Sequence, residues 1–280
     1  MRISVVGNIN IDLNAVIGDS VNSEENRINK LGLSSGGSAA NTAIMLSRLG
    51  RKVFLQGAVG DDLFGEYLIE RCSRERVETG YVKVLTGGTG LCFAVIGGQG
   101  QRHLYTYRGV NEKYEMVAGG FDFYHFAGIS TGQLSMILNS LNIERFSYNP
   151  GGIVTFERPR EVSKLAERAE VLFLNETEWA FLSPFLNRMN TVVVTMGAAG
   201  SRIEKGPAVK AFPVEAVDTT GTGDAFNAGF LHAYLSGKQG DECLKVGNLL
   251  GAIVTMQVGA VPEFDYGYIL EKSELYKVEL

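Results

Sequence analysis

Short runs of β-branched and aromatic residues alternate along this chain with segments of helical periodicity, and this alternation restricts the possible folds more than any other feature. The runs predicted to be strands lie at residues 3–6, 52–56, 121–126, 171–174 and 191–195. Strands separated by helices usually pair in parallel, and the helices then cover the sheet. The pattern therefore predicts an α/β fold with a mostly parallel sheet flanked by helices.

No feature divides the chain into separate folding units. Its 280 residues are 45% hydrophobic, which is enough to bury one large core. Its 35 glycines fall between apolar runs and form neither a linker nor a low-complexity tract. We therefore expect a single α/β domain over residues 1–280.

One region interrupts the alternation of strands and helices. Residues 89–97 and 101–107 resemble two strands joined by the glycine-rich residues 97–100, and residues 14–33 also lack a helical pattern. We expect segments of about 14–33 and 89–108 to form a small β-sheet that acts as a lid. An ordinary surface hairpin is the alternative. The exposed edge of such a sheet would also suit a homodimer contact.

Charge and cysteine content exclude several classes of partner. The formal net charge is −5, the isoelectric point is near 5.4, and no basic run is present, so nucleic acid is not an expected partner. Cys72, Cys92 and Cys243 are too widely spaced for a paired zinc motif or a disulfide framework. The first residues show neither a signal peptide nor a membrane span. We expect a cytoplasmic protein that binds a small molecule.

The strongest chemical signal is the run of residues 218–224, with the sequence DTTGTGD, which leads into a helical pattern. Phe226, Phe230 and Tyr234 lie four residues apart and would give this helix a buried face. The glycines before it would allow backbone amides to approach an anion at the helix N-terminus. Asp224, in the first turn, could accept a proton from a substrate hydroxyl. A simple helix-capping role is the alternative.

Two further groups of residues suggest a polyhydroxyl ligand. Asn8, Asn10 and Asp12 alternate with apolar residues, which would place them on one face of an extended strand. Residues 36–41, with the sequence GGSAAN, open a predicted helix, and Asn41 falls in its first turn. The two glycines would allow a ligand to approach closely. Packing of the helix on the sheet by these small residues is the alternative explanation.

Motifs of other enzyme classes are absent or incomplete. The chain has no nucleotide P-loop, no protein-kinase glycine loop and no dinucleotide-binding glycine motif after its first strand. Residues 128–132 do match Gly-x-Ser-x-Gly between a strand and a helix, a context that would make Ser130 the nucleophile of an α/β-hydrolase. The one histidine that follows it, His232, falls within a helical pattern. An α/β-hydrolase using Ser130 is therefore a remote alternative.

The two glycine clusters give the chain a resemblance to the ribokinase-like, or PfkB, carbohydrate and nucleoside kinases over nearly its full length. Residues 36–41 look like the family's Gly-Gly motif, and residues 218–224 are similar to its Asp-Thr-x-Gly-x-Gly-Asp signature. The resemblance implies a three-layer α/β/α core with a small β-sheet lid. It also implies an ATP-dependent phosphotransferase whose acceptor is an alcohol group.

The resemblance further implies roles for individual residues. The catalytic group would consist of Asp224 as general base and the anion-hole amides of Gly221, Thr222 and Gly223. Substrate hydroxyls would be held by Asn10, Asp12, Gly37 and Asn41. The nucleotide side would be formed by Asn175, Thr195, Gly197 and Asn248. Residues 175–178 look like the family's Asn-x-x-Glu motif, so Glu178 would act indirectly on magnesium.

Two loops are also similar to parts of the family pattern. Asp218 and Thr220, with the segment near residues 256–259, resemble the loops that hold a monovalent cation in many members. The sequence leaves a requirement for potassium open. Residues 109–111 are similar to the Gly-Ala-Asn run that rejoins the lid to the core.

The sequence departs from the sugar kinases at two places that bear on the acceptor. Residues 149–152 occupy the region where several sugar kinases carry Asp-x-Asn-x-Arg, so Arg158 or Arg160 would have to supply the missing arginine. Ser38 stands where ribokinases tend to have lysine. The chain looks closer to the archaeal nucleoside kinases than to bacterial ribokinase.

The expected acceptor is therefore the 5′ hydroxyl of a ribonucleoside, and a sugar such as ribose or fructose is the alternative. The nucleoside would bind between the core and the lid. Phe93, Tyr105 and Tyr107 of the lid are expected to stack on its base, although alternation along a hairpin could turn some of them to the other face.

Overall fold

The computed structural model describes residues 1–17, 27–97, 102–114, 118–187 and 190–280. Two parts of the predicted lid lie outside the described residues. These are residues 18–26 and most of the connection predicted at residues 97–100.

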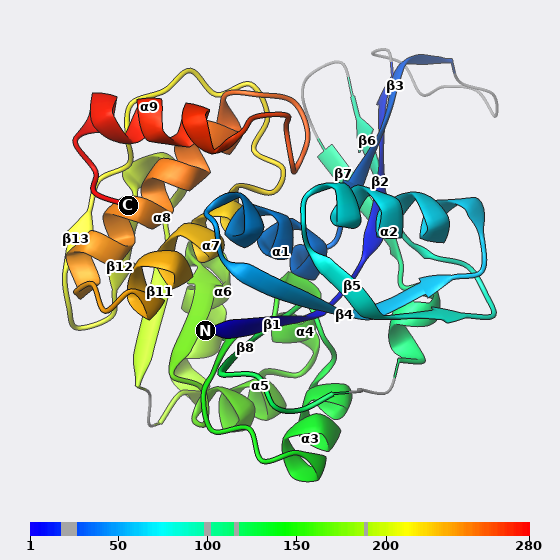
Figure 1. Cartoon of the computed structure of the whole chain (residues 1–280), viewed down its shortest axis with the longest axis horizontal. Coiled ribbons are helices and arrows are strands. Elements are labelled where there is room, and N and C mark those ends of the chain that lie inside the picture. Colours follow the sequence, from blue (N-terminus) through cyan, green and yellow to red (C-terminus); the bar gives the residue numbers. More distant parts are fainter. Residues whose placement is uncertain (18–26, 98–101, 115–117, 188–189) are drawn as a thin grey trace.

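A nine-stranded sheet forms the centre of the protein (Figure 1). Its order is β13-β12-β11-β10-β9-β8-β1-β4-β5, and all pairs from β11 to β5 are parallel. The strands are β1 (Arg2–Gly7), β4 (Lys52–Gly60), β5 (Glu78–Leu85), β8 (Phe123–Ala127), β9 (Phe146–Asn149), β10 (Val171–Asn175), β11 (Thr191–Thr195), β12 (Ser201–Ile203) and β13 (Ala208–Val209). The five strands predicted for the core are confirmed.

Helices cover both faces of this sheet, which confirms the three-layer α/β/α core (Figure 1). One face packs against α1 (Ser38–Arg48), α2 (Leu63–Arg74), α7 (Thr222–Leu235), α8 (Gly240–Thr255) and α9 (Tyr266–Tyr276). The other packs against α3 (Thr131–Ser140), α4 (Gly152–Glu157), α5 (Pro159–Ala166) and α6 (Glu176–Leu182). Side chains alternate between the two cores, since Phe173 of β10 belongs to the first and Leu172 and Leu174 to the second.

A second sheet of four strands projects from the end of the core at which β1 ends (Figure 1). It consists of β2 (Asn10–Ile17), β3 (Ile28–Gly36), β6 (Gly90–Ile96) and β7 (Arg102–Tyr107), in the order β3-β2-β6-β7. The predicted strand pair is present, because β6 and β7 pair in antiparallel fashion. The short helix η1 (Gly109–Glu112) follows β7 and leads back to the core.

Of the row of polar residues predicted on one strand, Asn10 and Asp12 lie on β2, whereas Asn8 lies in the connection between the two sheets. β1 ends at Gly7, β2 begins at Asn10, and the chain crosses from the large sheet to the small one at Asn8. Gly7 has a φ of 147°, and a Cβ there would overlap the carbonyl of Ala127. The prediction of one continuous strand was therefore wrong, because the backbone turns at a glycine that packs directly on β8.

None of the described helices is long and apolar enough to span a membrane. Cys72 and Cys243 are buried free thiols.

The buried face predicted for α7 is confirmed. The rings of Phe226, Phe230 and Tyr234 stack along the helix with centroid separations of 6.3 and 6.2 Å. Phe230 also meets Phe173 of β10 edge to face, at 5.3 Å. The apolar face of α7 thus anchors the helix on the centre of the large sheet.

Phe230→Ala should lower the free energy of unfolding by about 3–5 kcal/mol, because it leaves a cavity between α7 and β10. Phe230 is 1% exposed, whereas Phe181 of α6 is 41% exposed and also has aromatic neighbours. Phe181→Ala is the matched control and should cost markedly less. Denaturant unfolding of both variants measures the difference, and equal losses would contradict the anchoring role of Phe230.

Candidate active site

The site lies at the point where the strand order of the large sheet reverses. Successive strands extend to one side of β1 through β4 and to the other side through β8. In open α/β sheets, ligands bind in the crevice outside the carboxyl ends of the strands at such a switch point. The β1 end at Gly7 pairs with the β8 end at Ala127, and the N-terminal turns of α1 and α7 carry the predicted catalytic residues.

Asp224 lies in the first turn of α7, as predicted, and is held there by α1. The Nδ2 of Asn41, in the first turn of α1, donates to the Oδ2 of Asp224 at 2.8 Å. The hydroxyl of Ser38 also hydrogen-bonds to this carboxyl. No role in the site was predicted for Ser38, which is the first residue of α1 after the N-cap Gly37. The first turn of α1 therefore orients the candidate base.

Burial raises the pKa of the Asp224 carboxyl to about 7. Hydrogen bonds from Asn41 and Ser38 act in the opposite direction because they stabilise the charged form, and the negative charge of Asp12 raises the pKa further. A general base works best when its pKa lies near the pH of the reaction. The surroundings of Asp224 thus suit it for proton transfer at neutral pH.

The two glycines before α1 make room for Asp12 and for the crossing between the sheets. A Cβ on Gly36 would overlap the carboxylate of Asp12. Gly37 has a φ of 89°, and a Cβ there would overlap the carbonyl of Asn8. The Oδ1 of Asn41 is buried and has no hydrogen-bond partner among the described residues. The structure thus brings Asp12, Gly37 and Asn41 together around Asp224.

Asn10 is fixed by a residue to which the sequence assigned no role of its own. The Nδ2 of Asn111, in η1, donates to the Oδ1 of Asn10 at 2.9 Å, and its Oδ1 accepts from the amide of Ile9 at 3.2 Å. Asn111 therefore fastens the crossing between the two sheets to the segment that follows β7. The signal in the sequence was the run at residues 109–111, which indicated a junction but not its hydrogen bonds.

The loop before α7, predicted to bind an anion through its backbone, differs from the expected geometry at one point. Gly221 is the N-cap, with a φ of 74°, and Gly223 lies inside the first turn instead of before it. The helix can begin at Thr222 because Gly221 alone makes the left-handed turn. Gly223 is exposed, and a Cβ there would meet no atom within 4 Å. The amide of Thr222 donates to the carbonyl of Thr219 at 3.3 Å, so it is partly engaged within the loop.

Asp218 braces this loop against a second one. Its Oδ1 accepts from the amide and the hydroxyl of Thr220 at 2.9 and 2.7 Å. Its Oδ2 accepts from the amide of Gly259 at 2.9 Å. The two loops that resemble a cation site are therefore joined through one carboxylate.

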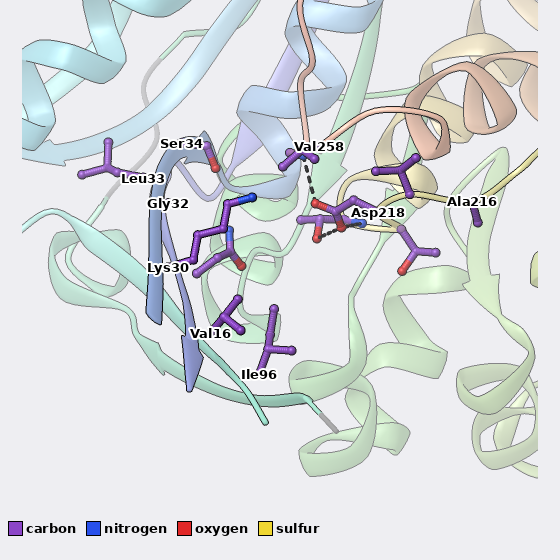
Figure 2. Close-up of a pocket in the computed structure, with 14 residues that line it drawn as sticks. Val16, Lys30, Gly32, Leu33, Ser34, Ile96, Ala216, Asp218 and Val258 are labelled. Carbon is purple, nitrogen blue, oxygen red and sulfur yellow. Dashed lines mark hydrogen bonds between the residues drawn. The ribbon is translucent and has the colours of Figure 1, made fainter. Parts of the chain in front are cut away.

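A pocket of about 520 Å³ separates the small sheet from the Asp218 loop (Figure 2). Figure 2 shows Lys30 and Val16 reaching into it from the small sheet, opposite Asp218 and Val258. The lining residues are Asn14, Val16, Lys30, Gly32, Leu33, Ser34, Ile96, Ala216, Val217, Asp218, Thr219, Thr220, Val258 and Gly259.

The three aromatic residues expected to stack on a base face away from this pocket. Val16 of β2 pairs with Ile96 of β6, and both residues line the pocket. Phe93 of β6 pairs with Leu13 of β2 and with Tyr105 of β7. Leu13 is an odd number of positions from Val16, so its side chain and those of its partners point to the opposite face of the sheet. Tyr107 pairs with Leu91 and has the same phase as Tyr105. Side chains alternate between the faces of a sheet, so Phe93, Tyr105 and Tyr107 all lie on the outer face. The stacking prediction was wrong for this pocket.

Three of the four residues predicted for the nucleotide lie at or just beyond the ends of two neighbouring strands. Asn175 ends β10 and pairs with Thr195, which ends β11, and Gly197 follows with a φ of 55°. Asn175 and Glu178 form a reciprocal capping box at the start of α6, with hydrogen bonds of 2.8 and 2.9 Å. Burial raises the pKa of Glu178, against the hydrogen bond from the amide of Asn175.

The side-chain amide of Asn248 is hydrogen-bonded to other residues through both its oxygen and its nitrogen. Its Oδ1 accepts from Ser201 at 2.9 Å, and its Nδ2 donates to the carbonyls of Val209 and Lys210, each at 3.2 Å. These bonds tie α8 to the strands β12 and β13. The polar atoms of Asn248 therefore hold α8 against the edge of the large sheet.

The structure does not support the hydrolase alternative, because neither Ser130 nor His232 is placed to act in a catalytic triad. Ser130 is the N-cap of α3 and forms a capping box with Gln133. The Nδ1 of His232 accepts from Arg51 at 3.2 Å, and His232 lies in α7. Ser130 is therefore a capping residue.

In the part of the chain that the structure describes, no group of three or more histidine, cysteine or acidic side chains is placed to hold a metal.

Comparison with known proteins identifies the family of this chain. The sequence profile of the pfkB family of carbohydrate kinases matches residues 1–264. The chain belongs to this family. It is 31% identical over 239 residues to an uncharacterized sugar kinase of Archaeoglobus fulgidus, covering 77% of this chain and 96% of that one. It is 28% identical over 255 residues to the ribokinase of Haemophilus influenzae, covering 80% and 82%.

The solved structures extend the likeness to the whole fold. The nucleoside kinase of Methanocaldococcus jannaschii superposes with a TM-score of 0.88 at 20% identity, covering 98% of each chain. The ribokinase-like fold is therefore confirmed. Family membership makes this pfkB protein a phosphotransferase that acts on an alcohol group of a sugar or nucleoside, and kinases of the ribokinase family use ATP.

The Asp224 carboxyl should titrate near pH 7 in the ligand-free protein. Asp12→Asn should lower its pKa, because it removes a negative charge that disfavours the ionised form. Asn41→Leu should raise the pKa, because it removes a donor to the carboxylate. Carbon NMR of labelled aspartate carboxyls measures all three titrations. A midpoint that both substitutions leave unchanged would contradict the environment described for Asp224.

Proposed function

We propose that this pfkB kinase transfers the γ-phosphoryl group of ATP to a primary hydroxyl of a small polyhydroxyl acceptor, with Asp224 as the general base. The observation that carries the proposal is the position of Asp224. Its carboxyl lies in the first turn of α7, is oriented by Asn41 and has a pKa of about 7. A base and an anion-stabilising helix N-terminus are thus combined within one turn.

The reaction is an in-line displacement at the γ-phosphorus. The acceptor oxygen forms a bond to phosphorus as the bond to the leaving ADP oxygen breaks, and Asp224 takes the hydroxyl proton. The amides of Gly221, Thr222 and Gly223 stabilise the charge on the transferring oxygens. Acceptor hydroxyls bind to Asp12, to the unpartnered Oδ1 of Asn41 and to the backbone near Gly37, with Asn10 as a neighbour.

The nucleotide lies along the carboxyl ends of β10 and β11, against Asn175, Thr195 and Gly197. Magnesium would be held with the ATP phosphates and would neutralise their charge, and Glu178 would contact it through water, since this ion retains most of its water ligands. The carboxylate of Asp218 and the hydroxyl of Thr220 are oxygen donors of the kind that potassium prefers, so these two residues would hold a monovalent cation. Asn248 ties α8 to the strands β12 and β13, which lie next to β11.

The favoured acceptor is a ribonucleoside, phosphorylated on its 5′ hydroxyl. The pocket of about 520 Å³ falls within the roughly 300–1,000 Å³ of small-molecule sites. Val16 and Ile96 on one side and Val258 on the other supply apolar walls for a base. The small sheet acts as a lid that excludes water. A free sugar is the second candidate, favoured by the sugar kinase and ribokinase among the relatives.

ATP consumption with a panel of nucleosides and sugars, each compared with a reaction without acceptor, tests the proposal. We expect turnover with at least one ribonucleoside. Turnover with sugars alone would keep the mechanism and replace the acceptor. No turnover with any member of the panel would overturn the proposed function.

Asp224→Asn should slow phosphoryl transfer on the order of 100- to 10,000-fold, because the amide cannot accept the proton. Ser130→Ala serves as control and should keep nearly full activity, since Ser130 caps α3. The rate of phosphorylated product formation measures both variants. Full transfer activity in Asp224→Asn would remove Asp224 as the base.

We further propose a homodimer through the outer face of the small sheet, which its exposed apolar side chains support. Leu31, Tyr105 and Tyr107 are all exposed and share this face. Tyr105→Asp should therefore convert a dimer to a monomer in light-scattering chromatography. Leu104→Asp is the matched control, because the exposed Leu104 neighbours Tyr105 on the opposite face. A monomeric wild-type protein would contradict the dimer.

A further inference from the structure

The segment of residues 256–264 packs directly against the loop that forms the anion-binding backbone. A Cβ on Gly221 would overlap the main chain of Ala260, so the two backbones are in close contact. The amide of Gly259 also donates to the Oδ2 of Asp218 at 2.9 Å. Any displacement of this segment therefore moves Gly221 and, with it, the first amides of α7.

Arg48, in the last turn of α1, holds this segment from behind. Its Nη1 donates to the carbonyl of Pro262 at 2.6 Å, and its guanidinium carbon lies 4.6 Å from the centre of the Phe264 ring. Its Nε and Nη2 donate to the two carboxylate oxygens of Glu75 at 2.9 and 2.6 Å. The Arg48 side chain is 6% exposed, so these partners replace nearly all of its water.

The opposite end of α1 holds the candidate base. Asn41 donates to Asp224 from the first turn of α1, and Arg48 binds Pro262 from the last turn. The two residues lie about 10 Å apart along the axis at 1.5 Å per residue. The helix between them is buried from residue 39 to residue 46. A rigid, buried helix thus fixes the candidate base and the anion-binding loop with respect to each other.

We propose that Arg48 is a positioning residue for the anion-binding loop and acts through Pro262 and Ala260 on the amide geometry at Gly221. The inference rests on the proposed function, in which those amides stabilise the transferring phosphoryl group. Arg48 is too far along α1 to touch the reacting atoms, and its effect is on the transition state. Misplacement of catalytic groups by about 1 Å can cost on the order of 100-fold in rate.

Lysine cannot replace arginine in this role. The planar guanidinium binds a carboxylate with two parallel hydrogen bonds and still has a donor for the Pro262 carbonyl. The ammonium group of lysine is a single point charge, so it cannot donate to both the Glu75 carboxylate and the Pro262 carbonyl at these positions. Arg48→Lys therefore preserves the buried charge and loses the clamp on the segment.

Arg71 offers a matched control. It also forms an ion pair with Glu75, in the same cluster, and is similarly buried. Its contact with the segment is a 4.0 Å approach to Glu263, whose side chain is 94% exposed, so this contact adds little. Arg71→Gln weakens the cluster and leaves the bond from Arg48 to Pro262.

The test compares the wild-type protein with Arg48→Lys, Arg48→Met and Arg71→Gln in two measurements. Steady-state kinetics use the acceptor that the wild-type enzyme phosphorylates. Calorimetry with magnesium measures the affinity for ADP alone and for ADP with aluminium fluoride, which mimics the transferring phosphoryl group. Reversible unfolding lowers both apparent affinities by the same factor, so a mere loss of stability leaves the ratio of the two affinities unchanged.

We expect both Arg48 variants to lose kcat by a factor on the order of 10 to 100, with little change in KM for the acceptor. Their affinity for ADP should stay near that of the wild type, and the extra affinity from aluminium fluoride should fall by a similar factor. Arg71→Gln should keep both values. If Arg48→Met fails to fold, the comparison of Arg48→Lys with Arg71→Gln alone tests the positioning role.

Equal behaviour of Arg48→Lys and Arg71→Gln in both measurements would overturn the positioning role. A wild-type protein that phosphorylates no acceptor and gains no affinity from aluminium fluoride would overturn the proposed function itself. The two failures are therefore distinguishable.

Discussion

The hydrogen bond from Asn41 to Asp224 joins the N-terminal turns of two helices that lie far apart in the sequence, and the geometry of the site depends on it. It can form because α1 and α7 both pack on the same face of the central sheet, where β1 meets β8. The apolar face of α7 fixes its depth, and the glycines at 36 and 37 bring Asp12 toward the same point. Burial, the hydrogen bond from Asn41 and the negative charge of Asp12 then all act on the pKa of Asp224. They give Asp224 the near-neutral pKa that general-base chemistry requires.

Most of the core could be predicted because its signals are local. A β-branched run in a parallel sheet is buried on both faces, so residues 171–174 and 191–195 indicate strands without reference to their neighbours. The same holds for the first turns of α1 and α7, where glycines and a polar residue stand at fixed offsets from the helix start. The sequence could therefore place Asn41 and Asp224 in helical first turns, and the fold brings the two together.

What the sequence could not provide depends on register and on long-range partners. The faces of Phe93 and Tyr105 follow from which residue of β6 lies opposite which residue of β2 and β7, and a shift of one position would have reversed them. The polar atoms of Asn248 are engaged by Ser201 and by carbonyls about 40 positions earlier in the chain, which no local pattern encodes. Arg48 looks like an ordinary basic residue at a helix C-terminus. Its contact with Pro262 spans 214 positions.

Local sequence signals mark the residues proposed for the chemistry, whereas strand register and long-range contacts determine the surface proposed to select the acceptor. In the proposed function, the residues that the sequence could assign surround the reacting hydroxyl, where the base and the anion-binding backbone do not depend on the rest of the acceptor. The rest of the acceptor would then meet the inner face of the small sheet, which presents Val16, Lys30 and Ile96 to the pocket. This face is set by strand register and belongs to no recognisable motif. On this proposal, a change of acceptor would require changes on β2, β3 and β6, and it could leave α1, α7 and their hydrogen bond as they are.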